Sequence, residues 1–219
     1  MPVGAYQQLS TIADLIVRVN PSRTLDIGIG FGTYGMLVRE YLDLWDNMNE
    51  TKAYAWKRGL DGVEVFEEYI TPMHRFLYDD IYIGDARAVV PAITKRYDLA
   101  ILADVIEHLS TADGKKLLVD ILAISDNVII TTPKNAKAQG ALYGNEHERH
   151  ISQWYEKDFL PFGDCLFIPN EGGSLICCIG TAVPRIRREI FTFKKRMRAL
   201  FPLAVILYRK LKQLFHISP

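Results

Sequence analysis

Three glycines and three acidic side chains stand where the first four predicted strands of this 219-residue chain end. The first predicted strand runs into Gly28, Gly30 and Gly32, just before a predicted helix. Glycines at such a turn let backbone N–H groups approach a ligand closely. Glu64, Asp85 and Asp104 end or follow the next three strands. Because ligands of open α/β sheets bind at the carboxyl ends of the strands, we expect these residues to share a small-molecule site.

The acidic residues suit a nucleoside ligand. A carboxylate at Glu64 can accept both hydroxyls of a ribose, and one at Asp85 can accept from an adenine amino group. Gly30-x-Gly32-x-x-Gly35 also fits the dinucleotide fingerprint, so NAD is an alternative cofactor. Asp26 argues against NAD. It lies two positions before the first glycine, where dinucleotide enzymes usually have an apolar residue.

The elements that must position these residues alternate along the chain. Hydrophobic periodicity and turn residues predict helices at 9–19, 33–44, 67–77, 86–94, 111–124 and 154–160. Strands are predicted at 24–29, 60–66, 80–83, 97–103, 127–132, 165–168 and 174–181. Five strands alternating with helices indicate a parallel sheet covered on both faces, to which the closing hairpin adds an antiparallel strand.

These segments resemble the class I S-adenosylmethionine-dependent methyltransferases over about residues 5–182. The segments that carry the resemblance are Thr24–Gly32, Gly62–Val65, Gly84–Ala86, Asp98–Leu109 and Val128–Pro133. The resemblance implies an α/β fold, a Rossmann-like, doubly wound sheet of seven strands, mostly parallel with the last strand antiparallel. The Ile-Glu-His-Leu stretch at 106–109 is similar to one in small-molecule methyltransferases of the quinone-biosynthesis type.

The resemblance also implies S-adenosylmethionine as cofactor and S-adenosylhomocysteine as product. By resemblance, the three glycines line the methionine side, Asp26 orders their loop, Glu64 holds the ribose, and Asp85 with Ala86 holds the adenine. The full set of cofactor-binding candidates is Asp26, Gly28, Gly30, Gly32, Glu64, Val65, Asp85, Ala86 and Asp104.

His108 follows the fourth strand, close to where the methyl group should lie, and is our candidate general base. Methyl transfer is an in-line displacement, in which the protein positions the acceptor, and a hydroxyl acceptor gains from a base such as histidine. We include Glu107 and His150 among the catalytic candidates. Glu107 and His108 could instead only orient the following loop.

The stretch Asp104-x-x-Glu107-His108 also resembles a metal-binding stretch of some small-RNA terminal methyltransferases and some quinone O-methyltransferases. His147 or His150 could supply a distant ligand, and the set Asp104, Glu107, His108 and His147 would suit Mg, Mn or Zn. The same residues could bind a polar substrate. We do not expect a metal to be required.

The loop 134–150 follows the fifth predicted strand, so we expect it to overhang the site as a substrate lid. Its polar and aromatic residues suggest an oxygen-rich acceptor such as a sugar: Tyr143, Asn145, Glu146, His147, Arg149 and His150. Trp154 is expected in the core rather than against a ring of the substrate.

Charge is divided unevenly along the chain. Lys plus Arg and Asp plus Glu each number 26, but ten basic residues and one acid follow Pro184. The segment 185–219 therefore carries +9 and the remainder −9. We expect two domains, a methyltransferase domain at 1–184 and a basic amphipathic helical tail at 185–219, with apolar positions at Ile186, Ile190, Phe193, Met197 and Leu200.

The tail could pack on the body or on a second subunit, lie on an anionic membrane surface, or contact RNA. No secretory signal or spanning segment is apparent, so we expect a cytoplasmic protein with possible membrane association through the tail. The predicted function is O-methylation of a small molecule, sugar or lipid-linked glycan intermediate. The alternatives are an RNA methyltransferase with a metal-assisted site and a non-catalytic cofactor-binding module.

Overall fold

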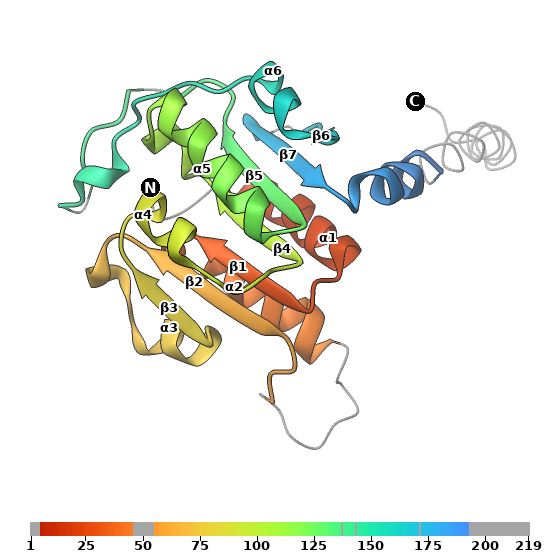
Figure 1. Cartoon of the computed structure of the whole chain (residues 1–219), viewed down its shortest axis with the longest axis horizontal. Helices are drawn as coiled ribbons and strands as arrows, with labels where there is room; N and C mark the ends of the chain where they lie inside the picture. Colours follow the sequence, from red (N-terminus) through yellow and green to blue (C-terminus); the bar gives the residue numbers. More distant parts are fainter. Residues whose placement is uncertain (1–4, 46–54, 137, 143, 171, 193–219) are drawn as a thin grey trace, which may run out of the picture. The chain divides into compact units, whose positions relative to one another are not determined.

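A seven-stranded mixed sheet forms the centre of the protein (Figure 1). The computed structural model describes residues 5–45, 55–136, 138–142, 144–170 and 172–192. The strand order is β3-β2-β1-β4-β5-β7-β6, and β7 alone runs against its neighbours. This confirms the predicted doubly wound sheet with an antiparallel last strand. In the dinucleotide fold the order continues with a parallel sixth strand, so the reversed β7 also separates this sheet from the NAD alternative.

The strands lie close to their predicted positions. Their bounds are β1 Arg23–Ile27, β2 Gly59–Glu64, β3 Asp80–Ile83, β4 Leu99–Ala103, β5 Asn127–Pro133, β6 Cys165–Ile168 and β7 Ser174–Gly180. All of β4 is buried, and so are the first six residues of β5, as expected for central strands covered on both faces. The predicted closing hairpin forms as the antiparallel pair β6–β7.

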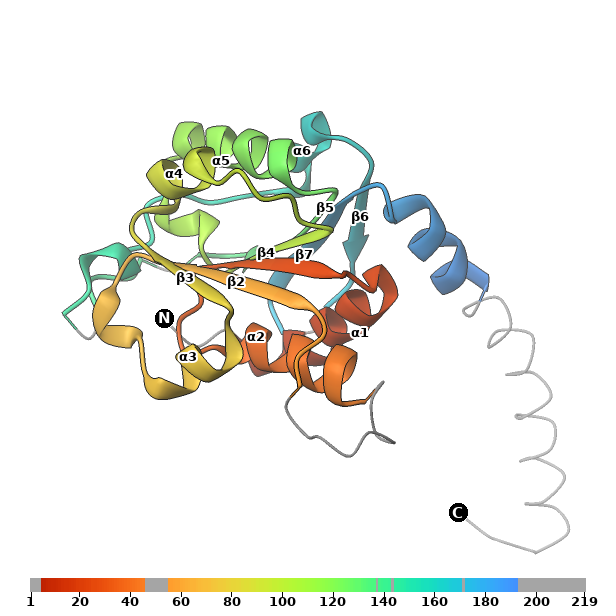
Figure 2. The ribbon, with the colours of Figure 1, turned by 60° about the horizontal axis from the view of Figure 1, so that its bottom comes forward.

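Helices cover both faces of the sheet, with α1, α2 and α3 on one side and α4, α5 and α6 on the other (Figure 2). Their bounds are α1 Leu9–Val19, α2 Thr33–Val38, α3 Pro72–Leu77, α4 Ala86–Val89, α5 Thr111–Ile124 and α6 Glu156–Phe159. Short turns of helix are η1 Tyr6–Gln8, η2 Arg39–Leu44, η3 Glu67–Tyr69, η4 Val90–Ala92, η5 Ile106–His108, η6 Glu146–Glu148 and η7 Leu160–Phe162.

Three predicted helices are each divided in the structure, and the one predicted at 86–94 forms α4 followed by the short turn η4. The helix predicted at 67–77 splits into η3 and α3, because Pro72 starts a new helix and Thr71 caps it. The helix predicted at 33–44 continues beyond α2 as the π-helical turn η2. None of these differences moves the residues at the strand ends.

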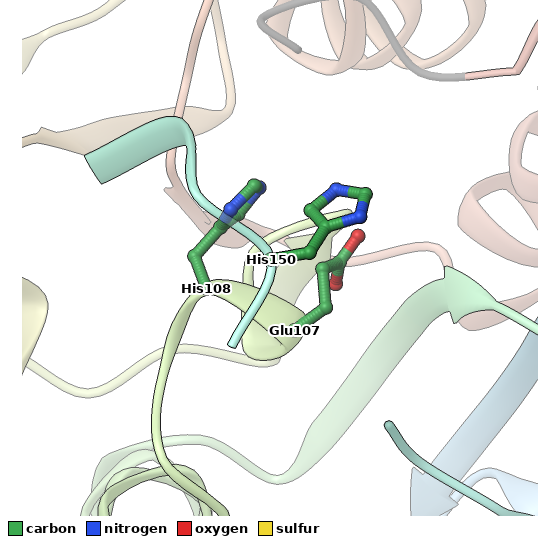
Figure 3. A group of neighbouring side chains, drawn as sticks. All are labelled: Glu107, His108 and His150. Carbon is green, nitrogen blue, oxygen red and sulfur yellow. The ribbon is translucent and has the colours of Figure 1, made fainter. Parts of the chain in front are cut away.

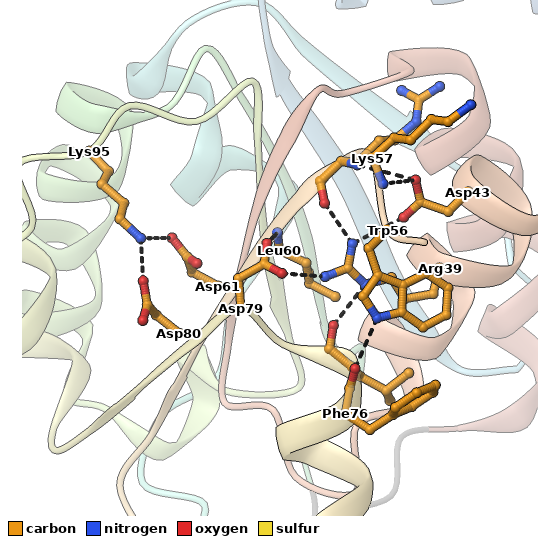
Figure 4. A network of polar contacts seen from close by, with 12 residues as sticks. Arg39, Asp43, Trp56, Lys57, Leu60, Asp61, Phe76, Asp79, Asp80 and Lys95 are labelled. Atoms are coloured by element: carbon orange, nitrogen blue, oxygen red, sulfur yellow. Dashed lines mark hydrogen bonds and ion pairs between the residues drawn. The ribbon is translucent and has the colours of Figure 1, made fainter. Parts of the chain in front are cut away.

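The side chain of Arg39, which is 1% exposed, joins η2 to β2 and α3 (Figure 4). Its guanidinium donates to Asp43 Oδ2 and Asp79 Oδ1, both at 3.0 Å, and to the carbonyl oxygens of Leu77 and Arg58 at 2.7 and 2.6 Å. A buried charge needs such partners, because its desolvation is otherwise uncompensated. This network fixes the start of β2, and with it the register that brings Glu64 to the site.

The chain divides into two units, Met1–Val183 and a second that begins at Pro184. Residues 183–192 are helical, and Arg185 pairs with Glu189 at 3.1 Å. The predicted tail positions from Phe193 onward lie outside the described residues. Within the described ranges, no helix combines the length and hydrophobicity that crossing a bilayer requires.

Candidate functional site

The loop after β1 has the geometry of a ligand cradle. Gly28, Gly30 and Gly32 have φ angles of 75°, 50° and 80°, a backbone region that residues other than glycine rarely adopt. A Cβ atom added to Gly28 would also overlap the side chain of Val105. Glycine is therefore required at Gly28 by both backbone conformation and space.

One cavity lies at the carboxyl ends of β1, β2, β3 and β4, where the sequence predicted a shared site. Of the predicted cofactor-binding residues, seven line it: Gly28, Gly30, Glu64, Val65, Asp85, Ala86 and Asp104. Gly32 and Asp26 do not line it. Gly32 precedes α2 and lies against the ring of His74.

Asp26 is completely buried within β1, below the glycine loop. Tyr78 donates its hydroxyl to Asp26 Oδ2 at 2.6 Å. Burial raises the pKa of Asp26 to about 7, against the opposing effect of this hydrogen bond. Asp26 is thus bonded to Tyr78 inside the protein and is not among the residues that line the cavity, while its ordering of the glycine loop stays a prediction.

Glu64, at the end of β2, is 4% exposed and holds the loop in place. Its two oxygens accept backbone N–H groups, Oε2 from Gly30 and Oε1 from Phe66, both at 3.0 Å. Burial raises the pKa of Glu64, and these hydrogen bonds oppose that shift. A carboxylate has about four acceptor positions, so the two bonds leave capacity for ligand hydroxyls.

Asp85 caps the N-terminus of α4 by accepting from the backbone N–H of Arg87 at 2.9 Å. The Arg87 guanidinium also donates to both carboxylate oxygens, and it lowers the pKa of Asp85. A second acid, Asp113, accepts from Arg87 at 3.1 Å. Asp85 is therefore a carboxylate whose charge a neighbouring cation offsets.

Asp104 follows β4 with a φ of 54°, unusual for a residue other than glycine. Its Oδ1 accepts from the Thr131 hydroxyl at 2.8 Å, and its Oδ2 accepts from Gln8 Nε2 at 2.7 Å. Gln8 also donates to the Tyr34 hydroxyl at 2.9 Å. Neither Gln8 nor Tyr34 was predicted from the sequence, because neither forms part of a local motif. The bond from Gln8 to Asp104 spans 96 residues.

The catalytic candidates Glu107, His108 and His150 come together at η5 (Figure 3). One ligand atom from each lies within 4.8 Å of the other two, and the two imidazole rings are 5.0 Å apart. The backbone N–H groups of Ile151 and Ser152 donate to the Glu107 carbonyl at 2.9 and 3.1 Å. These bonds carry the loop that follows β5 back onto η5.

Glu107 is 1% exposed, and its Oε2 has no hydrogen-bond partner among the described residues. Burial, followed by the charge of Asp104, raises the pKa of Glu107 to about 8. His108 Nδ1 donates to the Arg149 carbonyl at 3.0 Å, which leaves Nε2 as the acceptor nitrogen of the neutral ring. Burial lowers the pKa of His108, which favours that neutral form.

The loop between β5 and α6 covers part of the cavity, to which it contributes Asn145, His147 and Glu148. The Tyr69 hydroxyl donates to Glu148 Oε1 at 3.1 Å, and His147 acts electrostatically on Asp85. The loop thus lies over the end of the cavity near Glu64 and Asp85. Tyr69 is a further lining residue that the sequence analysis missed, because nothing local distinguishes it. Tyr143, a predicted lid residue, is outside the described residues.

His147 lines the cavity near Asp85, so the histidine that joins Glu107 and His108 is His150. Asp104 likewise stands outside that group of three. Trp154 is 1% exposed and donates Nε1 to the Ile106 carbonyl at 3.1 Å, which confirms its predicted place in the core.

No family model matches the sequence, and no curated protein matches it. Solved structures resemble the fold. CalS10 from Micromonospora echinaspora, an amino pentose methyltransferase with S-adenosylmethionine bound, superposes with a TM-score of 0.57 and 13% identity over 82% of this chain and 92% of that one. The methyltransferase domain of bacterial CtHen1 gives 0.52 and 20% identity over 80% and 98%.

An O-methyltransferase structure from Nostoc punctiforme gives a TM-score of 0.55 and 18% identity over 78% of this chain and 54% of that one. This chain thus spans about half the length of that protein. These three proteins are at most 20% identical to this chain in sequence, so the similarity shows a shared fold and no more. The chain has the fold of the class I S-adenosylmethionine-dependent methyltransferases.

Proposed function

We propose that this protein is an S-adenosylmethionine-dependent methyltransferase that acts on an oxygen atom of a small molecule or sugar. The observation that carries the proposal is the cavity where the glycine loop, Glu64, Asp85 and Asp104 meet at four strand ends. Structures with this fold contain the cofactor or its product, as CalS10 and the EvdMO1 domain do.

The residues present fit the cofactor. Gly28 allows Val105 to pack against the loop backbone, and Gly28, Gly30 and Val105 all line the cavity. Glu64 has acceptor capacity for ribose hydroxyls, while Asp85 and Ala86 lie beside it for the adenine. When bound, S-adenosylmethionine supplies an electrophilic methyl group.

His108 lines the same cavity beyond Asp104, and the protein fixes its orientation through Arg149. The free Nε2 of the neutral ring is suited to accept a proton from an acceptor hydroxyl as the methyl group is transferred. His150 and Glu107 adjoin it and can share that proton. The acceptor's oxygen therefore has both a base and a neighbouring relay.

Calorimetric titration with S-adenosylmethionine tests the cofactor proposal. We expect saturable binding and a rise in melting temperature. A chain that shows neither heat nor a thermal shift would contradict the proposal. Binding without methyl transfer to any acceptor would favour the non-catalytic cofactor-binding module instead.

A metal-assisted site is a second candidate, and the observation that favours it is the group Glu107, His108 and His150. One carboxylate and two imidazoles suit Mn, Zn or another divalent ion. Activity that survives chelation, together with no metal in elemental analysis, would exclude this variant of the function. The RNA methyltransferase alternative would be favoured only if the protein methylates RNA and needs a metal ion to do so.

We also propose that the basic segment 185–219 binds an anionic membrane surface, which would suit a lipid-linked glycan acceptor. Its support is the sequence alone, since basic residues are each worth about 1 kcal/mol near an anionic leaflet. A chain that ends at Pro184 should lose binding to vesicles containing phosphatidylserine. Equal binding by the full chain and the shortened chain would refute the membrane role.

A further inference from the structure

The side of α3 that carries His74 lies against the loop after β1. His74 is completely buried, and its Nε2 lies 3.0 Å from the carbonyl oxygen of Gly30. Tyr78, just past the end of α3, stacks on the His74 ring with the ring centres 6.3 Å apart, and its hydroxyl donates to Asp26 at 2.6 Å. Two side chains about one helical turn apart thus bond to β1 and to the glycine loop that follows it.

The partners of His74 fix which of its ring nitrogens carries the hydrogen. The backbone N–H of Thr71 donates to Nδ1 at 3.0 Å, so Nδ1 is the acceptor nitrogen of a neutral ring. Nε2 therefore carries the hydrogen and donates it to the Gly30 carbonyl. A ring protonated on both nitrogens would set an N–H against the N–H of Thr71. Burial lowers the pKa of His74, against the effect of the bond to Gly30, and so favours the neutral form that this geometry requires.

His74 and Glu64 together hold both peptide groups of Gly30. The Gly30 N–H donates to Glu64 Oε2, and the Gly30 carbonyl accepts from His74, both at 3.0 Å. These atoms belong to successive planar peptide groups, and the angle between the two groups is set by the φ and ψ of Gly30. Holding both groups therefore fixes the backbone of Gly30, which has a φ of 50° and lines the cavity. Glu64 alone would fix only the first group.

Gly32 leaves the space that the His74 ring occupies. A Cβ atom at Gly32 would lie 3.2 Å from Cδ2 and 3.3 Å from Nε2 of the ring, closer than side chains normally pack. Gly32 does not line the cavity, so contact with a ligand does not explain why this residue is a glycine. The ring of His74 and the φ of 80° at Gly32 do explain it.

We propose that His74 is a positioning residue for the cofactor, on which it acts through the carbonyl group of Gly30. This inference rests on the proposed methyltransferase function, in which the glycine loop lines the methionine side of S-adenosylmethionine. His74 itself does not line the cavity, so it contacts neither the cofactor nor the acceptor directly. Loss of its bond to Gly30 should weaken the binding of the methionine portion and leave the binding of the adenosine portion, assigned to Glu64 and Asp85, nearly unchanged.

Two variants separate the two hydrogen bonds of the His74 ring. Asparagine carries its oxygen close to the place of Nδ1, so His74→Asn keeps the acceptor for Thr71 and removes the donor to Gly30. Glutamine carries its amide nitrogen close to the place of Nε2, so His74→Gln keeps that donor. Calorimetry with S-adenosylhomocysteine and with 5′-methylthioadenosine, which lacks the amino-acid portion, measures the effect on each portion of the cofactor. Arg75→Asn, at an exposed position of the same helix, is the matched control.

We expect His74→Asn to weaken S-adenosylhomocysteine binding by about three- to tenfold, the usual contribution of one hydrogen bond, while methylthioadenosine binding hardly changes. His74→Gln should recover most of that loss, and Arg75→Asn should match the wild type. The inference is overturned if His74→Asn leaves both affinities unchanged, if it lowers both equally, or if His74→Gln recovers nothing. A wild-type chain that binds neither compound would instead contradict the proposed function.

The wild-type chain decides if the His74→Asn variant does not fold, or if methylthioadenosine binds too weakly to measure. Nitrogen-15 NMR of the imidazole near neutral pH should show His74 as a neutral ring with its hydrogen on Nε2. Exchange of that hydrogen with solvent should slow when S-adenosylhomocysteine is bound. A hydrogen on Nδ1, or an exchange rate that the compound does not change, would overturn the inference.

Discussion

Two buried glutamates differ in their hydrogen-bond partners. Glu64 is the last residue of β2, and Glu107 lies in η5, just after β4. At the cofactor end, both oxygens of Glu64 accept backbone N–H groups, so the side chain is held before any ligand arrives. At the acceptor end, Glu107 Oε2 has no partner among the described residues, and the pKa of this side chain rises to about 8. In the proposed function the first arrangement is a preformed cofactor contact, and the second is a buried carboxyl group beside the proposed base, His108.

The largest expected effect comes from Gly28 at the cofactor end. Gly28→Ala adds a Cβ that overlaps Val105 and forces a residue with a side chain into a φ of 75°. We expect S-adenosylmethionine binding to become undetectable by calorimetry. Gly140→Ala, where an added Cβ has no neighbour within 4 Å, is the matched control. Retained affinity in Gly28→Ala would show that the loop does not approach the ligand.

At the acceptor end, His108→Gln should slow methyl transfer by about 10²- to 10⁴-fold, the usual contribution of a positioned general base. The affinity for S-adenosylmethionine should remain within about threefold of wild type, because the cofactor contacts in the proposal lie elsewhere. Single-turnover rates with saturating cofactor measure the first quantity, and calorimetry measures the second. If this variant transfers methyl groups at the wild-type rate, His108 is not the general base and only orients the following loop.

Exchanging each glutamate for glutamine compares the two ends directly. In Glu64→Gln an amide replaces an oxygen that accepts a backbone N–H, at a cost of about 1–3 kcal/mol. We expect cofactor affinity to fall about tenfold. In Glu107→Gln the affinity should be unchanged while turnover falls. The opposite pattern, with Glu107→Gln weakening the cofactor, would remove the division between the two ends.

The smallest effect is on stability. Since the pKa of Glu107 rises from 4.5 to about 8 on folding, the native state binds its proton more tightly than the unfolded state does. The resulting stabilisation is fully present below pH 4.5 and is lost as the pH rises toward about 8. Glu107→Gln should therefore gain several degrees in melting temperature relative to wild type between pH 5 and pH 8. Parallel melting curves for both proteins across that range would contradict the shifted pKa.

The cofactor end was largely predictable from sequence, and the acceptor end was predictable only in part. Glycines and acids at strand ends are local signals, so Gly28, Glu64 and Asp85 could be placed on the cavity once the strands were assigned. Gln8, Tyr34 and Tyr69 could not, because their roles depend on contacts between distant segments. His150 was a candidate whose meeting with Glu107 depends on how the loop after β5 returns, which no local pattern specifies.

The hydrogen bond from Gln8 to Asp104 has a consequence for the order of folding. It joins the turn before α1 to the end of β4, across 96 residues. Contacts of such separation form late, since the intervening chain must first be ordered. A nascent chain leaving the ribosome therefore cannot form this bond, and cannot close this side of the cavity, until β4 and Asp104 have emerged.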